Sequence, residues 1–181
     1  MKNIKLVILA FFMTAVCGLS GQDAISKDGD MNLIVNGSFE QGTTSGWDFN
    51  NASICIDKDS PDAGKQSLKI DGSGKPSFIY GIQSIAAKLK PSTEYVFSVD
   101  IKRSSSKGNV MASVVEKAKK DQADWCYHKC ELPGGVLDKW EHFSIKFKTG
   151  NEVADAAVML YNISSEGMAW FDNVSLIEVK Q

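Results

Sequence analysis

Apolar and polar residues alternate with a period of two along most of the chain beyond residue 31, as they do in strands that are buried on one face. Every second residue from Tyr95 to Ile101 is apolar, with Ser98 and Asp100 between them, and the alternation recurs from Phe143 to Phe147. Further short runs of this type occur at 32–40, 53–57, 66–71, 78–85, 109–116, 156–162 and 169–179. The pattern predicts an all-β fold, an antiparallel two-sheet β-sandwich.

Turn-forming residues separate these runs. Asp-Gly-Ser-Gly occupies 71–74, Lys-Pro-Ser occupies 90–92 and Pro-Gly-Gly occupies 133–135, each between two predicted strands. The charged stretch 114–124 departs from the strand pattern and has two interpretations, a turn of helix or a solvated excursion between strands.

The first residues have the pattern of an export signal. Lys2 and Lys5 precede an uncharged apolar run, 6–16, which is shorter than the roughly 20 residues that a membrane-spanning helix needs. We therefore expect residues 1–21 to be a signal peptide, residues 22–30 to be a flexible leader, and the mature protein to be secreted or periplasmic without a transmembrane span. Acylation of Cys17 would instead make it an anchored lipoprotein.

The remaining residues, 31–181, are enough for one domain with a single core. The whole chain has a formal net charge of -2, and loss of Lys2 and Lys5 with the signal makes the mature protein more acidic. Nucleic acid is therefore not an expected partner, because basic surfaces bind polyanions.

The cysteines leave one thiol unpaired. Cys55, Cys126 and Cys130 remain if Cys17 is cut away or acylated. In an oxidising compartment the expected disulfide joins Cys126 and Cys130, although either thiol could reach Cys55. His128 lies between the two cysteines and suggests a zinc site as an alternative, but no second pair of ligands follows at zinc-finger spacing.

Several motifs occur along the domain in a characteristic order. The segment 32–40, Asn-Leu-Ile-Val-Asn-Gly-Ser-Phe-Glu, is followed by Gly46-Trp47, and Ala-Trp-Phe-Asp-Asn-Val-Ser-Leu closes the domain at 169–176. Between them are Ala-Gly-Lys-Gln-Ser-Leu-Lys-Ile at 63–70, Leu-Lys-Pro-Ser-Thr-Glu-Tyr at 89–95 and Lys-Trp-Glu at 139–141. In this order the motifs resemble carbohydrate-binding modules of the family 4, 9 and 22 type. The resemblance implies a galactose-binding-like jelly roll.

The resemblance also implies a structural calcium ion. Glu40 and Asp172 would bind it through their side chains, and Ser38 and Lys65 through their main chain. Calcium takes about six to eight oxygen ligands, which these groups begin to supply if the first and last strands pair. In the alternative interpretation, Asp172 caps a turn and Glu40 is solvated.

Sugar rings stack on exposed aromatic side chains, while amides and carboxylates receive their hydroxyl groups. Most aromatic residues occupy inward positions or the motifs above, so we assign them, Trp47 included, to packing. The aromatic residues left over are Phe78, Tyr80, Trp125, Tyr127 and Tyr161. In the family, the strand with Tyr80 and Gln83 lends an aromatic and a polar group to a concave binding face. The expected ligand-binding residues are Tyr80, Gln83, Trp125, Tyr127 and Tyr161.

Known catalytic motifs are absent from the sequence. The chain has no Gly-x-Ser-x-Gly or His-Glu-x-x-His motif, and its only histidines are His128 and His142. A dyad of Cys55 or Cys130 with a histidine is the remaining catalytic alternative. We expect a non-catalytic protein that binds poly- or oligosaccharide, with any glycoside hydrolase as a separate partner. The alternative is an exported structural or adhesion protein of the same fold without sugar binding.

Overall fold

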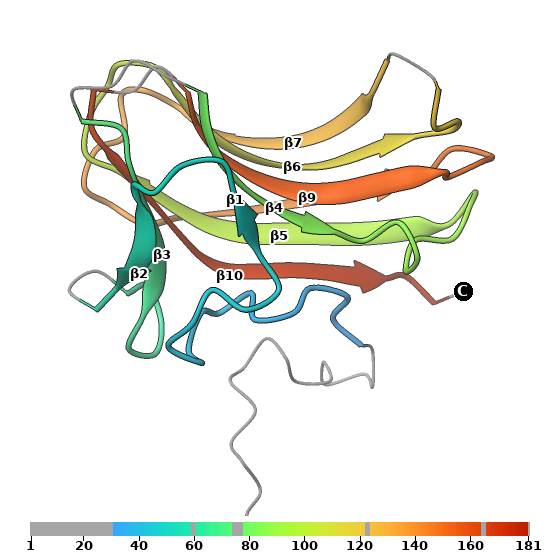
Figure 1. The fold of residues 1–181 in the computed structure, drawn as a ribbon, viewed down its shortest axis with the longest axis horizontal. Helices are drawn as coiled ribbons and strands as arrows, with labels where there is room; N and C mark the ends of the chain where they lie inside the picture. The colour runs from blue at the N-terminus through green and yellow to red at the C-terminus, as the bar shows by residue number, and fades with distance from the viewer. Residues whose placement is uncertain (1–30, 59–60, 74–77, 122–123, 164–165, 181) are drawn as a thin grey trace, which may run out of the picture.

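The computed structural model describes residues 31–58, 61–73, 78–121, 124–163 and 166–180. In this part of the chain ten strands and no helices form two sheets that pack face to face (Figure 1). No helix there is long and apolar enough to cross a bilayer. The expected signal peptide and leader, with Cys17, lie outside the described residues.

Each sheet has five antiparallel strands. The first, called here the β9 sheet after its central strand, has the order β1-β4-β9-β6-β7. Its strands are β1 (Asp48–Phe49), β4 (Phe78–Ser84), β9 (Asp155–Ile163), β6 (Asn109–Lys117) and β7 (Cys126–Leu132). The second, the β10 sheet, consists in order of β2 (Ile54–Asp57), β3 (Ser67–Asp71), β10 (Met168–Glu178), β5 (Glu94–Arg103) and β8 (Glu141–Lys148). The predicted two-sheet antiparallel sandwich is confirmed.

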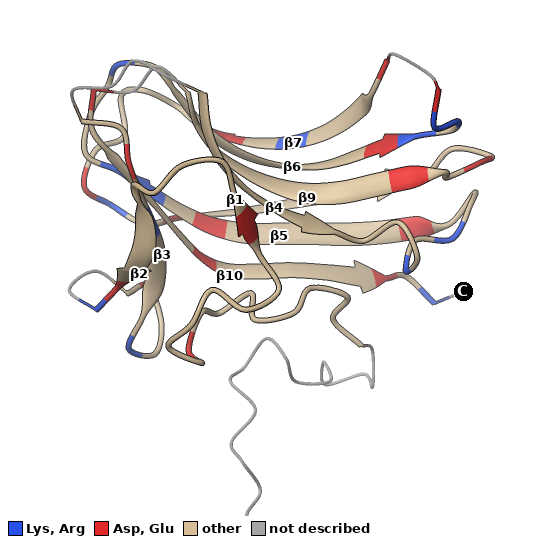
Figure 2. Cartoon of the chain, viewed as in Figure 1, with Lys and Arg blue, Asp and Glu red and all other residues tan. Residues whose placement is uncertain are grey.

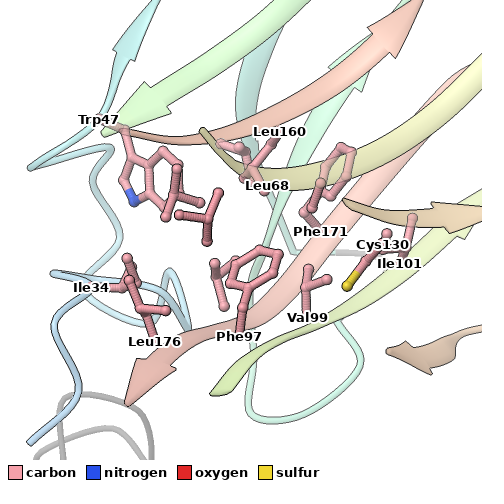
Figure 3. Close-up of a cluster of buried hydrophobic side chains, with 14 of the residues drawn as sticks. Ile34, Trp47, Leu68, Phe97, Val99, Ile101, Cys130, Leu160, Phe171 and Leu176 are labelled. Carbon is pink, nitrogen blue, oxygen red and sulfur yellow. The ribbon is translucent and has the colours of Figure 1, made fainter. Parts of the chain in front are cut away.

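The core lies between the two sheets and follows the period-two pattern. Phe97 and Val99 of β5 face the interior with Phe171 of β10, and Leu160 of β9 and Cys130 of β7 meet them from the other sheet (Figure 3). All five side chains are at most 2% exposed. Close packing of the inner faces leaves the outer faces available for other roles.

The segment 32–40 is not the strand that its pattern predicts. Asn36 and Phe39 have positive φ angles of 51° and 58°, which interrupt an extended chain. The segment nevertheless runs beside β10, because the Leu33 amide donates to the Leu176 carbonyl at 2.8 Å and the Val174 amide donates to the Gly37 carbonyl at 3.0 Å. The two ends of the domain are therefore adjacent.

The region 114–132 also differs from expectation. Strand β6 continues to Lys117, and the residues expected to form a disulfide-closed loop form the strand β7, paired with β6. Cys126 and Cys130 are four residues apart on one extended strand, which separates their Cα atoms by about 13 Å, whereas a disulfide needs less than about 7 Å. The predicted disulfide is therefore wrong, and Cys55, Cys126 and Cys130 are free thiols.

Arg103 holds the turns at one end of the sandwich together. Its side chain is 1% exposed, and its guanidinium donates hydrogen bonds to four backbone carbonyls. The acceptors are Ser105, Lys107, Gly108 and Leu132. One planar side chain thus links the β5–β6 turn to the end of β7.

We expect Arg103→Lys to lower the free energy of unfolding by about 2–4 kcal/mol, because an ammonium cannot reach all four carbonyls and leaves buried acceptors unpaired. Chemical denaturation measures this change. Lys107→Met is the control in the same turn, since its exposed pair with Glu166 (Nζ to Oε2, 2.7 Å) contributes less than about 1 kcal/mol. Equal stability of Arg103→Lys and the parent would contradict this role.

Candidate functional site

An aromatic cluster lies on the outer face of the β9 sheet. Side chains alternate across a strand, so Phe78, Tyr80 and Ile82 of β4 share the face opposite the core. Tyr161 of β9 is directly opposite Tyr80 in the β4–β9 register, and Met159 is opposite Ile82. Strand pairing thus brings together residues about 80 positions apart in the sequence.

Three rings form the centre of this cluster. The ring centroids are 5.3 Å apart for Phe78 and Tyr80, 5.4 Å for Phe78 and Tyr161, and 6.5 Å for Tyr80 and Tyr161. These separations and the tilted ring planes are typical of favourable aromatic contacts. Phe78 is 49% exposed and Tyr161 only 4%, so Tyr161 forms the floor of the cluster and Phe78 its accessible part.

The hydroxyl of Tyr161 is held by neighbours on the same face. It donates to the Met159 sulfur at 2.9 Å and accepts from the Ser113 hydroxyl at 3.4 Å. Burial raises the pKa of Tyr161, so the phenol stays neutral. Its main contribution is a fixed floor on which the more exposed rings rest.

Trp125 and Tyr127 extend the cluster to the far edge of the sheet. Tyr127 is 50% exposed and lies opposite Val115 in the β6–β7 register. Lysine ammonium groups lie over both rings, Lys117 at 4.6 Å from the Trp125 centroid and Lys129 at 5.3 Å from the Tyr127 centroid. Such cation–π contacts orient aromatic side chains that the core does not hold.

The aromatic residues of this cluster line one hollow of about 270 Å³. The strands of the β9 sheet that run beneath this hollow bend along their length (Figure 1). The hollow is lined by Phe78, Tyr80, Ile82, Val115, Trp125, Tyr127, Ala157, Met159 and Tyr161. Four predicted ligand-binding residues, Tyr80, Trp125, Tyr127 and Tyr161, therefore lie together.

Charged residues occupy the two edges of the same face. Asp48 of β1 pairs with Ile82, and on β7 Lys129 pairs with Ser113 and Glu131 with Met111. Figure 2 shows acidic colour on β1 and both charges on β7. An apolar floor with polar groups at its margins suits a ligand that has an apolar face and a hydroxylated rim.

The prediction for Gln83 is wrong. Gln83 is 4% exposed and lies on the inner side of β4, where its Oε1 accepts from the Val35 amide at 2.8 Å and its Nε2 donates to the Val35 carbonyl at 2.9 Å. Tyr80 and Gln83 are three residues apart on a strand and so point to opposite faces. Gln83 anchors the N-terminal segment and does not line the hollow.

Three of the four residues predicted to hold a metal, Glu40, Lys65 and Asp172, meet at the loop 61–66 beside the other sheet. Glu40 Oε1 accepts from the amides of Lys65 at 2.7 Å and Gln66 at 2.8 Å. Gly64 allows this approach, because a Cβ there would lie 2.5 Å from the same oxygen. Ser38, 4% exposed, lies two residues before Glu40.

Asp172 approaches the same loop from β10. Its Oδ2 accepts from the amides of Asp62 at 3.1 Å and Ala63 at 3.2 Å, and its Oδ1 accepts from Asn173 at 2.7 Å. Burial raises the pKa of Asp172 to about 7, although these hydrogen bonds lower it. Burial and the nearby Asp100 carboxylate also raise the pKa of Asp62.

Glu40 and Asp172 offer the type of ligand that a hard cation takes, while their carboxylates also accept hydrogen bonds from loop amides. Glu40 and Asp172 bring oxygen donors to one loop, and the buried Asp172 carboxylate lacks the solvation that would favour its charged form. The same carboxylates cap loop amides, so the turn-capping interpretation of Asp172 and a metal-binding one are compatible.

The Cys130 thiol does not have the environment of a nucleophile. Burial raises the pKa of Cys130 to about 11, which disfavours the reactive thiolate. His142 Nδ1 instead lies 2.6 Å from Asp100, and His128 Nε2 lies 2.9 Å from Glu116. The dyads considered from the sequence thus gain no support from these contacts.

Sequence reasoning missed two parts of the aromatic face. Phe78 belongs to the candidate aromatic set but not to the expected ligand-binding residues, and the sequence gives no signal for the edge residue Asp48. Its two-residue strand, β1, is too short to show an alternating pattern. Only the pairing with β4 places Asp48 on this face.

Solved structures with the same fold include several carbohydrate-binding modules. A family 16 carbohydrate binding module-2 matches with a TM-score of 0.68 and 22% identity, over 81% of this chain and all of that one. The CBM22-1 xylan-binding domain of Paenibacillus barcinonensis Xyn10C matches with a TM-score of 0.63 and 16% identity, over 84% of this chain and 97% of that one. The module TmCBM61, solved with β-1,4-galactotriose, matches with a TM-score of 0.54 and 14% identity, over 82% of this chain and 99% of that one.

A curated relative is the tRNA nuclease WapA of Bacillus subtilis strain 168, 27% identical over 168 residues. The aligned region covers 83% of this chain but 7% of that protein, so the match concerns a small part of a much longer molecule. Residues 31–165 match the model of a family described as a carbohydrate binding domain. With the fold and the motif order in agreement, the chain belongs to this family of carbohydrate-binding domains.

Proposed function

We propose that this chain is an exported, non-catalytic protein that holds a poly- or oligosaccharide on the aromatic face of the β9 sheet. The observation that carries the proposal is the convergence of Phe78, Tyr80, Trp125 and Tyr127 on one hollow of about 270 Å³. These side chains come from two segments that are far apart in the sequence, and the core does not require them there. Large solvent-facing apolar side chains grouped in one place mark an interaction surface.

The chemistry of the face matches a sugar chain. A pyranose ring has one C–H face that stacks on Tyr80 or Trp125, and its hydroxyl groups can bond to phenols and to charged groups at the rim. Lys129 and Glu131 at one edge and Asp48 at the other supply both donors and acceptors. The pairing of the five strands of the β9 sheet holds these groups in place, which reduces the ordering entropy lost on binding.

The spacing of the carboxylates supports binding rather than hydrolysis. Asp48 and Glu131 lie on the two edge strands of the five-stranded β9 sheet. Four strand spacings of about 4.8 Å separate these strands by about 19 Å. Glycosidases place their two carboxyl groups no more than about 9.5 Å apart. These two carboxylates are too far apart to act as such a pair, and we propose that any cleaving enzyme is a separate glycoside hydrolase.

Two further arguments bear on location and ligand class. Lys2, Lys5 and the apolar run 6–16 favour export, which would bring the protein to extracellular glycans. The structural neighbours that bind xylan and β-1,4-galactotriose make these glycans the first probes for this chain.

We also propose a structural calcium ion held by the side chains of Glu40 and Asp172 and the main chain of Ser38 and Lys65. Bound there, calcium would supply positive charge beside the desolvated Asp172 carboxylate. Glu40 belongs to the N-terminal segment 32–40 and Asp172 to the last strand. The two side chains would therefore fix the loop 61–66 where this segment lies beside β10. The role is stabilising, since these residues lie on the β10 sheet side and do not line the aromatic hollow.

Removing a ring from the hollow should weaken sugar binding without unfolding the protein. We expect Tyr80→Ala and Trp125→Ala each to reduce affinity about tenfold, which corresponds to about 1.4 kcal/mol of lost stacking. Affinity gel electrophoresis in xylan, galactan and β-glucan measures this, and circular dichroism monitors the fold.

Trp140→Ala is the matched control for these variants. Trp140 is half-buried outside the hollow, with the Lys102 ammonium 5.5 Å from its ring centroid, and should leave retention unchanged. Retention of Tyr80→Ala and Trp125→Ala equal to the parent would remove these residues from the site. Self-association without retention on any glycan would favour the structural or adhesion alternative.

Calcium should raise the melting temperature of the purified chain. At calcium about 100 times its dissociation constant, the expected stabilisation is about 2.7 kcal/mol, or roughly 5–10 °C in a domain of this size. Differential scanning calorimetry with calcium and with EDTA measures the difference.

Asp172→Asn should abolish this calcium dependence, whereas Glu166→Gln, at an exposed side chain, should preserve it. A melting temperature that is the same in calcium and in excess EDTA would refute the calcium proposal but not the sugar-binding proposal.

A further inference from the structure

Three potential metal ligands converge where β6 ends and β7 begins. Glu116 is directly opposite Cys126, and Val114 is opposite His128, so Glu116, Cys126 and His128 share the inner side of the β9 sheet at its edge. His128 Nε2 lies 2.9 Å from Glu116 Oε1 and 3.8 Å from Cys126 Sγ. All three potential ligand atoms lie within 4.8 Å of one another.

The contacts have the arrangement of a ligand set and not of a catalytic relay. In a relay, the nucleophile contacts one ring nitrogen and the carboxylate orients the histidine through the other. Here the Cys126 thiol and the Glu116 carboxylate both approach the same nitrogen, Nε2 of His128. A proton on Nε2 would have to be shared between the two contacts, whereas one cation between the three atoms would bind all of them directly.

The separations suit a tetrahedral ion. Zinc bonds of about 2.0 to 2.3 Å place two ligand atoms about 3.3 to 3.6 Å apart. The observed distances of 2.9 and 3.8 Å bracket this range, so small side-chain rotations would complete the geometry. Thiolate and imidazole ligands select zinc-class ions over calcium, which prefers oxygen.

Neighbouring groups hold two of the three ligands. The His128 ring stacks on Phe147 of β8, with centroids 4.0 Å apart and planes inclined by 20°. Glu116 Oε2 accepts from the Gly150 amide at 3.3 Å, and the Glu116 side chain is only 5% exposed. Such outer contacts fix the orientation of metal ligands.

The third ligand opens onto solvent. Cys126 is exposed, and with Glu116 it lines a cavity of about 260 Å³ whose walls include Lys148, Gly150 and Glu152. An ion bound by three protein ligands keeps a fourth position for water, and this cavity has room for it.

We propose that Glu116, Cys126 and His128 bind one zinc-class divalent ion, with the fourth coordination position open to the adjacent cavity. None of the three residues lines the aromatic hollow, and none belongs to the loop 61–66, so the site is independent of the sugar and calcium proposals. It differs from the zinc site considered from the sequence, because Glu116 of the paired strand takes the place of Cys130.

The test is titration of the purified, metal-free chain with Zn²⁺ and with Co²⁺ in excess calcium, which occupies hard oxygen sites. We expect one equivalent of Zn²⁺ to bind, and Co²⁺ to give a thiolate charge-transfer band with visible bands of tetrahedral intensity. Cys126→Ser, His128→Gln and Glu116→Gln should each weaken binding by at least the roughly 10–100-fold that changes to outer groups cause. Cys55→Ser and His142→Gln should bind like the parent.

Alkylation of the parent tests the site without any variant that could misfold. Cys55 and Cys126 are both exposed, so iodoacetamide should modify both in the metal-free protein. Zn²⁺ should protect Cys126 and leave Cys55 reactive, as peptide mass spectrometry would show. Absence of a stoichiometric ion, unchanged binding in the three variants, or equal protection of Cys55 would each overturn the proposal.

Discussion

The pairing of β4, β9, β6 and β7 is the constraint on which the rest of this molecule depends. Each strand points alternate side chains to opposite faces, so a fixed register decides at once which residues form the core and which form the outer surface. A slip of one residue in β9 would move Tyr161 into the interior and Leu160 to the surface. The buried set is strongly apolar, so its packing enforces the register that assembles the aromatic hollow.

A second constraint acts where the chain ends meet. The segment 32–40 cannot join the β10 sheet as a regular strand, since Asn36 and Phe39 have left-handed backbones. Side-chain hydrogen bonds replace the missing backbone hydrogen bonds of a strand pair. Gln83 bonds both the amide and the carbonyl of Val35. Glu40 and Asp172 accept hydrogen bonds from amides of the loop 61–66. The arrangement buries carboxylate at an energetic cost, which the raised pKa of Asp172 reflects. The calcium ion proposed above would offset that cost when bound.

The sequence was sufficient for most of the fold because its strands are long and half-buried. Alternation in 95–101 and 143–147 predicted β5 and β8, and the family motifs predicted that the chain ends lie together. The alternating pattern fails where backbone conformation or strand pairing determines the structure. Nothing in 32–40 shows that Asn36 has a positive φ, and the two-residue strand β1 exists only through its partner β4.

The sequence predicts that the candidate site is an aromatic face, but it does not predict every residue that lines this face. Aromatic residues outside the predicted core did gather in one hollow, and large apolar side chains grouped on a surface mark an interaction site. Gln83 was assigned by analogy, although the period of two already separates it from Tyr80. Its burial shows that face assignment within one strand is more reliable than transfer of a role from a family.

Strand β7 takes the place of the disulfide predicted between Cys126 and Cys130, and its pairing with β6 fixes the residues on both of its faces. A disulfide from Cys126 to Cys130 would have stiffened Trp125 and Tyr127 covalently, whereas the register with β6 does so through backbone hydrogen bonds and leaves the thiols free. Odd positions of β7, such as Tyr127 and Lys129, then face the aromatic hollow, while Cys126 and His128 face inward beside Glu116. Two kinds of chemistry can share one strand because a strand has two faces, and each can vary without disturbing the other.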